Sequence, residues 1–337
     1  MSVHAARAKF WLFSILLAFV ALAPSWAAAA DRLGLHRPFD GIVVFGDSLS
    51  DPGNAFALTG QNLSPPTYGM TTPEELLTLV PDAPYAKGGN HFSNGPTWVE
   101  DLGRAIGLAA SVRPAFAMNS KGTNYAVGGA RARAVGSFHL AVQVDAFLAD
   151  VRGRASADAL YVVALGGNDV RDALQLGDPT IIAGAIGSIA EHIQILYRAG
   201  ARKFLVWNSP NIAVTPAVRA IAAVNPGVPV LAAAEGLSFA FKVNLDIALG
   251  QLSAGLPGIE IVRFDAFTEI NRIVEKPALF GLDNVTTACI TPNVPPFQCR
   301  RPDRHLFWDG IHPTRAGHAI AALLVGRTLL VGLLQDD

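Results

Sequence analysis

The chain alternates short apolar runs with longer segments of helical pattern, and this alternation limits the folds that it can adopt. The apolar runs cover residues 42–45, 124–127, 159–165, 204–207 and 259–264. Each run is followed by glycine, asparagine or aspartate, and short runs of this composition are typical of parallel strands buried on both faces. Strands that alternate with helices predict a three-layer α/β/α sandwich around a central parallel sheet.

The helical patterns between and after these runs lie at residues 96–108, 138–151, 180–199, 230–252 and 314–334. In the last of them Thr314 is the expected N-cap, because its hydroxyl can accept a hydrogen bond from an early backbone N–H of the helix. We expect the apolar side of this helix to carry Ala319, Leu323, Leu324 and Leu330.

Residues 1–30 have the composition of a cleaved secretory signal peptide. A short positive region precedes the apolar run Phe10–Ala23, and Ala27–Ala30 supplies small residues for cleavage. The uncharged stretch is also long enough to cross a bilayer, so a membrane anchor is the alternative. Pro24 and the alanine run favour the signal peptide. We therefore expect export to the periplasm or the medium, with one large domain over residues 31–337.

The charge balance argues against nucleic acid as a partner. The whole chain has 26 basic and 27 acidic residues. Removing residues 1–30 takes away Arg7 and Lys9 and no acid, so 24 − 27 gives a net charge of about −3 for the mature chain. Nucleic-acid binding requires a basic face that attracts phosphates, which this composition does not favour.

The only two cysteines, Cys289 and Cys299, flank a proline-rich segment. In an exported protein such a pair usually forms a disulfide that closes a loop, and we predict one here. A zinc site would need more ligands than this segment offers. A cysteine nucleophile would need a partner histidine and a sequence context better suited to catalysis than that of Ser48.

Two distant segments supply the parts of a nucleophilic serine site. Ser48 follows the first apolar run on the turn after Gly46, and Asp309 and His312 lie three residues apart near the C-terminus. A serine hydroxyl is a weak nucleophile until a base accepts its proton, and a carboxylate holds that base in the correct tautomer. Serine after a strand is also an ordinary turn residue, so the distant Asp-x-x-His is what favours catalysis.

Other polar residues should gather at the same edge of the sheet. Ser48, Gly129 and Asn168 each follow the end of a different apolar run. Ligands of open α/β sheets bind beyond the carboxyl ends of the strands, so we expect these three to converge there. The segment 61–91 contains five prolines, and it is either a lid over this edge or plain surface.

Four segments resemble conserved blocks of the GDSL, or SGNH, hydrolase family. Phe45-Gly46-Asp47-Ser48-Leu49-Ser50 resembles its first block, Asn124-Tyr125-Ala126-Val127-Gly128-Gly129-Ala130 its second, Gly166-Gly167-Asn168-Asp169 its third, and Asp309-Gly310-Ile311-His312-Pro313-Thr314 its fifth. The segment 92–98 is similar to a stretch of the plant-type and bacterial lipase branch. The blocks occur in the family's order across most of the chain, and they imply a flavodoxin-like fold.

The resemblance implies a role for each site residue. Ser48 would be the nucleophile, His312 its base and Asp309 the carboxylate that orients the base. The oxyanion donors would be the N–H of Ser48, a glycine N–H of the second block and the side-chain amide of Asn168. We place the glycine donor at Gly129, with the neighbouring Gly128 as the open alternative.

The resemblance also implies a carboxylic ester hydrolase of the esterase, lipase or phospholipase type that works through an acyl-enzyme. It would need neither a metal nor an organic cofactor. Its substrate would be the ester of a lipid or a small alcohol, and the protein would make transient contact with a membrane surface to reach a lipid substrate. An acyltransferase or a polysaccharide deacetylase would use the same residues. A catalytically silent binding module is disfavoured, because such a module has no reason to retain Ser48, Asn168, Asp309 and His312 together.

Overall fold

The computed structural model describes residues 39–59, 86–87, 89–291 and 298–333. The expected signal peptide and most of the 61–91 segment lie outside these residues. A four-stranded sheet forms the centre, with strands β1 Ile42–Gly46, β2 Leu160–Ala164, β3 Lys203–Trp207 and β4 Glu260–Phe264. All neighbours pair in parallel in the order β1-β2-β3-β4. The predicted parallel sheet is confirmed.

One predicted strand is not regular. Residues 124–127 run beside β1, where the Tyr125 N–H donates to the Val44 carbonyl at 2.8 Å and the Val127 N–H to the Gly46 carbonyl at 3.2 Å. The segment nevertheless forms only isolated bridges, from Asn124 to Val44 and to Pro114. The reason is that the Gly46 N–H donates to the Gln143 side chain at 2.9 Å instead of continuing the ladder.

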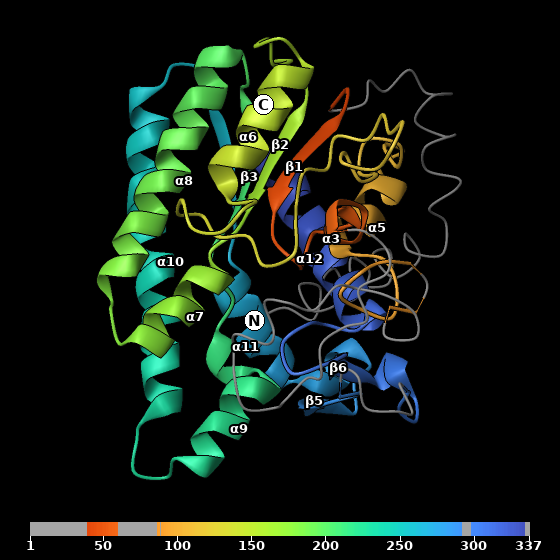
Figure 1. The fold of residues 1–337 in the computed structure, drawn as a ribbon, viewed down its shortest axis with the longest axis vertical. Helices are drawn as coiled ribbons and strands as arrows, with labels where there is room; N and C mark the ends of the chain where they lie inside the picture. The colour runs from red at the N-terminus through yellow and green to blue at the C-terminus, as the bar shows by residue number, and fades with distance from the viewer. Residues whose placement is uncertain (1–38, 60–85, 88, 292–297, 334–337) are drawn as a thin grey trace, which may run out of the picture.

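Helices cover both faces of the sheet (Figure 1). The side chains of Val43 and Phe45 pack with α6 Leu140–Asp150, α8 Thr180–Ala199 and α10 Val230–Gly255. The alternate side chains Ile42 and Val44 pack with α5 Trp98–Ala105 and α12 Arg315–Leu333 on the opposite face. Adjacent side chains of a strand point to opposite faces, so a strand that is apolar throughout needs both layers. The three-layer α/β/α sandwich is confirmed.

The predicted helices are present, but the buried side of α12 was assigned wrongly. Its start is as expected, since the Thr314 hydroxyl accepts the Gly317 N–H at 3.1 Å. Leu323 and Leu330 are 46% and 54% exposed, whereas Val325 and Leu329 are buried. Ala319 is exposed and Leu324 is buried, as are His318 and Ala322. The helix is apolar on all sides, so its pattern does not reveal which face meets the sheet.

Several elements that the sequence did not indicate complete the fold. They are the helices α3 Asn54–Thr59, α7 Gly167–Leu176, α9 Pro216–Val224 and α11 Ala266–Glu275, the 3₁₀ turns Ile212–Val214, Pro277–Phe280 and Pro302–Arg304, and the strands β5 Asn284–Ala288 and β6 His305–Phe307. β5 and β6 form a separate parallel pair. Each of α7, α9 and α11 lies beyond the carboxyl end of a sheet strand, where it can shape a site.

The disulfide predicted between Cys289 and Cys299 is present. Cys289 follows β5 directly, and its N–H donates to the Phe307 carbonyl at 3.0 Å. The next residue, Ile290, donates to the Trp308 carbonyl at 2.8 Å. The bridged segment is therefore attached to the strand that leads into Asp309, and the disulfide restrains the approach to this residue.

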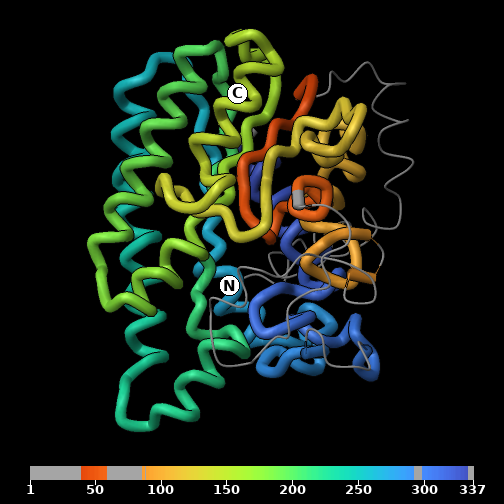
Figure 2. Tube along the Cα trace, viewed as in Figure 1, coloured from red at the N-terminus to blue at the C-terminus, as the bar shows by residue number. Residues whose placement is uncertain are grey.

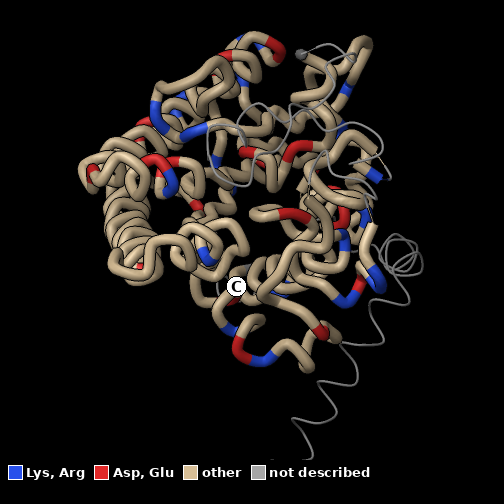
Figure 3. The backbone as a smooth tube through the Cα atoms, turned by 60° about the horizontal axis from the view of Figure 1, so that its bottom comes forward, with Lys and Arg blue, Asp and Glu red and all other residues tan. Residues whose placement is uncertain are grey.

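Charges of both signs are interspersed along the described chain, with no broad basic stripe in this view (Figure 3). This distribution agrees with the near-neutral composition. Of the described helices, α8 alone is long and apolar enough to cross a membrane by length and composition. Its Ile189, Ile193 and Leu196 are fully buried against core residues on one face of the sheet. This burial is typical of a core helix in a folded domain.

Candidate active site

Ser48 lies on a tight turn at the carboxyl end of β1. The Ser50 N–H donates to the Asp47 carbonyl at 3.0 Å, and the Leu49 N–H donates to the Asp47 side chain at 3.0 Å. A Cβ atom on Gly46 would lie 2.9 Å from the Cβ of Ser50, so only glycine fits at the end of the strand. The turn places Ser48 at the wall of a cavity, where it is 8% exposed.

Asp309, His312 and Ser48 form one chain of hydrogen bonds. The Asp309 Oδ2 lies 2.7 Å from the His312 Nδ1, and the His312 Nε2 lies 2.8 Å from the Ser48 Oγ. The other carboxylate oxygen of Asp309 accepts the N–H groups of Ile311 and His312, both at 2.7 Å. The loop before α12 thus contacts the loop after β1, although the two loops lie near opposite ends of the described chain (Figure 2).

A segment far from both loops holds the histidine in place. The Phe92 ring packs on the His312 ring with a centroid distance of 5.1 Å. The Ser93 hydroxyl donates to the Pro313 carbonyl at 2.8 Å, and the Asn94 side chain accepts the Arg315 N–H at 2.7 Å. The segment 92–98, noted in the sequence for its resemblance alone, therefore positions His312.

The candidate oxyanion donors surround the same turn. Val127 bonds to Gly46, so Gly129 and Ser48 each lie two residues beyond a paired position. The Gly128 N–H donates to Asp51 at 2.8 Å, whereas the N–H groups of Gly129 and Ser48 have no hydrogen-bond partner among the described residues. This geometry favours Gly129 over Gly128 as the candidate donor, since the N–H of Gly129 is available to a ligand.

Asn168 is the third candidate donor, and it lines the same cavity as Ser48. It belongs to the first turn of α7, directly after the glycines that follow β2. One N–H of its side-chain amide donates to the Ala130 carbonyl at 2.8 Å. This bond fixes the orientation of the amide and leaves its second N–H available to a ligand. It also joins the loop after β2 to the loop that carries Gly129.

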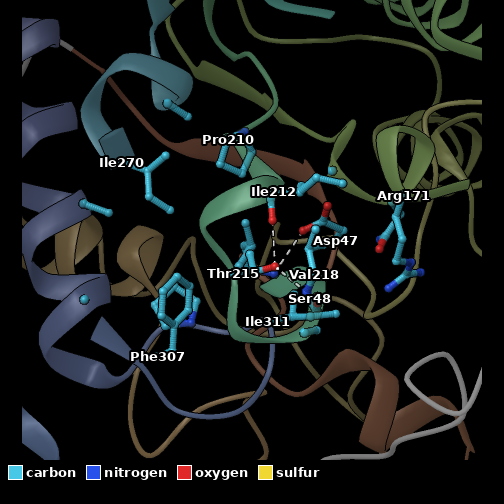
Figure 4. Close-up of a pocket in the computed structure, with 18 of the residues that line it drawn as sticks. Asp47, Ser48, Arg171, Pro210, Ile212, Thr215, Val218, Ile270, Phe307 and Ile311 are labelled. Carbon is cyan, nitrogen blue, oxygen red and sulfur yellow. Dashed lines mark hydrogen bonds between the residues drawn. The ribbon is translucent and has the colours of Figure 1, made fainter. Parts of the chain in front are cut away.

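The cavity beside Ser48 has a volume of about 150 Å³ and a mostly apolar lining. It extends between α7, α9, α11, β6 and α12. In Figure 4, Arg171 lies on one side of Ser48, and Ile270 and Phe307 lie on the other. A nucleophile at the wall of an apolar cavity, with donors aimed beside it, can bind and attack an acyl group.

Comparison with known proteins identifies the family. The sequence model of the GDSL-like lipase/acylhydrolase family matches residues 42–325. The chain belongs to this family.

Its curated relatives agree with this assignment. A GDSL esterase/lipase of Arabidopsis thaliana is 27% identical over 333 residues, which cover 84% of this chain and 86% of the relative. A second one is 26% identical over 366 residues, covering 92% and 90%. A Pseudomonas putida protein known as an uncharacterized protein in the trpE-trpG intergenic region is 28% identical over 92% of this chain and 51% of its own length. The chain is accordingly a carboxylic ester hydrolase.

The first and second blocks of this GDSL chain are joined by buried polar side chains. Besides Gly128, Asp51 accepts the N–H groups of three residues at the start of α3, Gly53, Asn54 and Ala55. The Asn54 amide donates to the carbonyls of Asn124 and Ala126 at 2.7 and 2.8 Å. Asp51 and Asn54 therefore connect the two loops that carry Ser48 and Gly129.

Burial changes the protonation of the carboxylates around this site. It raises the pKa of Asp51 to about 6, against the effect of its four N–H donors. It also raises the pKa of Asp47 to about 6, although the Leu49 N–H and the nearby charges of His312 and Arg171 favour the ionised form. Both carboxylates are therefore ionised in neutral solution and gain protons in mild acid.

The third block is supported by an ionic network behind it. Asp169 accepts the Ala132 N–H at 2.8 Å and the Arg133 side chain at 2.9 Å. Asp172 bonds to Arg131 at 2.8 Å and to Arg133 at 2.6 Å. These bonds tie the start of α7 to the loop after Gly129, and so they hold Asn168 and Gly129 together.

His318, on the helix that follows His312, has a structural role. His318 is fully enclosed, its Nδ1 accepts the Trp98 N–H at 3.3 Å, and burial lowers its pKa to about 3. Among the described residues, the one group of possible metal ligands is Cys289, Cys299 and His305, whose ligand atoms lie within 4.8 Å of one another. Both sulfurs are in the disulfide, so this group offers no thiolate to a metal ion.

Proposed function

We propose that this chain is an exported serine esterase that hydrolyses carboxylic esters of lipids or small alcohols through an acyl-enzyme. The observation that carries the proposal is the continuous hydrogen-bonded chain from Asp309 through His312 to Ser48, at 2.7 and 2.8 Å. Each member is buried to at least nine-tenths, so water competes weakly for these bonds.

The geometry supports a two-step acyl transfer. The His312 Nε2 accepts the Ser48 proton while Oγ attacks the ester carbonyl, and the carbonyl oxygen becomes an oxyanion. The N–H groups of Ser48 and Gly129 and the Asn168 amide stabilise this oxyanion. His312 then donates its proton to the leaving alcohol, and a water molecule repeats the sequence to release the acid. Asp309 remains ionised and keeps the Nδ1 proton facing it.

Fluorophosphonate labelling tests the nucleophile. The probe should label the purified protein at Ser48, as located by peptide mass, and Ser48→Ala should abolish both labelling and hydrolysis of p-nitrophenyl esters. Ser253→Ala, on the exposed side of α10, is the matched control and should behave as the unmodified protein. Unchanged circular dichroism would show that Ser48→Ala is folded. Full ester hydrolysis by this variant would contradict the proposal.

Hydrolysis is distinguished from acyl transfer by its products. An acyl-enzyme that water resolves yields free acid even when a competing alcohol is present, whereas an acyltransferase yields mostly the new ester. Chromatography of the products with and without added butanol measures this partition. Predominant butyl ester at low butanol concentration would favour the acyltransferase alternative.

Export is tested separately. The alanine-rich end of residues 1–30 supports cleavage between Ala27 and Asp31. The intact mass of protein recovered from the periplasm or medium of an expressing bacterium should match a chain that begins in this interval. A protein of full mass that sediments with membranes would support the anchor instead.

A further inference from the structure

The two ends of the cavity beside Ser48 differ in chemistry. Toward α7 it is lined by Arg171 and Gln175, and Gln175 is exposed to solvent. In the opposite direction the lining comes from α11, β6 and α12 and is mostly apolar, with one carboxylate, Glu269, beside Ile270, Ile273, Phe307, Ala321 and Leu324. Figure 4 shows the two directions, with Arg171 on one side of Ser48 and Ile270 and Phe307 on the other. One end thus carries polar side chains and reaches solvent, and the other is mostly apolar and enclosed by core residues.

The cavity as a whole is large enough for a short hydrocarbon chain. At its apolar end the walls belong to the core, since Phe307 is 1% exposed and Ile273 and Leu324 are 6% exposed. The whole cavity has a volume of about 150 Å³. An apolar cavity of about this volume in another protein stays dry and binds benzene, a molecule of six carbons. The apolar end therefore favours hydrocarbon over water.

We propose that the apolar end of this cavity holds the acyl chain of the substrate and that it fits chains of about six to eight carbons best. This inference rests on the proposed function. During the reaction the acyl group stays bound to Ser48 through two steps, whereas the alcohol must leave and water must enter. A closed apolar end suits the group that stays. The open end beside Arg171 and Gln175 suits the exchange of alcohol for water.

Helix α12 supplies a position at which the length of this chain can be changed. Gly317, Ala321 and Leu324 line the cavity at successive turns of the helix, over about 10 Å of its length. Ala321 is half-buried, so the ring of Ala321→Phe would enter the cavity. Ala319 lies on the same helix but is exposed. Since residues two apart on a helix do not share a face, Ala319→Phe is a matched control.

The test compares two series of esters on the same proteins. One series varies the acyl group, with p-nitrophenyl esters from acetate to dodecanoate, and the other varies the alcohol, with acetates of linear alcohols. In the unmodified protein, kcat/KM should rise to hexanoate or octanoate and then fall. Ala321→Phe should lower the ratio of octanoate to acetate turnover at least about tenfold, because a few methylenes in an apolar pocket carry this much discrimination. Ala319→Phe should change neither series.

A variant of opposite effect keeps the test decisive if Ala321→Phe folds poorly. Ile270 is half-buried in the wall of the cavity, and Ile270→Ala should move the acyl optimum to longer chains. A shift in the alcohol series alone would show that the cavity holds the alcohol and would overturn the inference. A flat acyl profile in an active enzyme would overturn it and leave the proposed function standing. An unmodified protein that turns over no ester would overturn both.

Discussion

Replacing Asp309 by asparagine should reverse the tautomer of His312, and the structure shows why the amide has only one orientation. One carboxylate oxygen of Asp309 accepts two backbone N–H groups at 2.7 Å, and the other faces the His312 Nδ1 at 2.7 Å. In Asp309→Asn the amide oxygen must stay on the two N–H donors, because an NH₂ group there would face donors only. The NH₂ group therefore faces Nδ1.

The expected loss of activity follows from this orientation. An N–H donor opposite Nδ1 requires a lone pair on Nδ1, so the imidazole proton moves to Nε2. The Nε2 lies 2.8 Å from the Ser48 Oγ, and once protonated it cannot accept the serine proton. The same exchange in the triad of a serine protease lowers kcat about 10⁴-fold, which corresponds to about 5 kcal/mol of activation free energy.

Steady-state hydrolysis of p-nitrophenyl hexanoate measures this loss. We expect kcat to fall about 10⁴-fold with KM changed little, and the urea midpoint to remain close to that of the unmodified protein, because both backbone bonds survive. Asp303→Asn is the matched control. Asp303 is half exposed and pairs with Arg315, and exposed pairs contribute little. A kcat of Asp309→Asn within tenfold of the unmodified protein would refute the reasoning.

Three further outcomes test other parts of the structure. Asn168→Ala should lower kcat by about 10²–10³-fold or less, since two backbone donors to the oxyanion remain, and a loss as large as that of Ser48→Ala would contradict its role as one donor of three. Thiol titration of the denatured, unreduced protein should find no free thiol, and reduction of the Cys289–Cys299 bridge, which closes ten residues, should lower the free energy of unfolding by about 2–3 kcal/mol. Because the pKa of folded His318 is lowered to about 3, its contribution to stability is present above pH 6.5 and is lost as the pH falls toward 3, by up to about 1.4 kcal/mol per pH unit. His318→Asn keeps an acceptor for the Trp98 N–H and should remove this dependence of stability on pH. The free energy of unfolding is measured by urea denaturation at pH 4, 5 and 6. An equal change of this free energy with pH in both proteins would contradict the prediction.

The sequence by itself determined the sheet and the identity of the reactive groups. The runs of β1, β2 and β3 are short and almost entirely apolar, and burial on both faces satisfies such strands. The residue types of Ser48, Asp309 and His312, and their positions after a strand end and on one loop, were enough to predict their meeting. The cysteine pair was predictable because the sequence has only two cysteines, which can pair with each other in a single way.

Only the tertiary structure decided how these parts are held and what shape surrounds them. Gly129 rather than Gly128 offers its N–H because Asp51, distant in sequence, occupies the other. The regular pairing of residues 124–127 ends because Gln143 takes the Gly46 N–H. The buried face of α12, and the cavity that it closes with α11, depend on packing between elements that are apolar on several sides. The local sequence pattern indicates which residues prefer burial. The partner of each buried group depends on contacts between residues that are far apart in the sequence, and these contacts determine the geometry of the site.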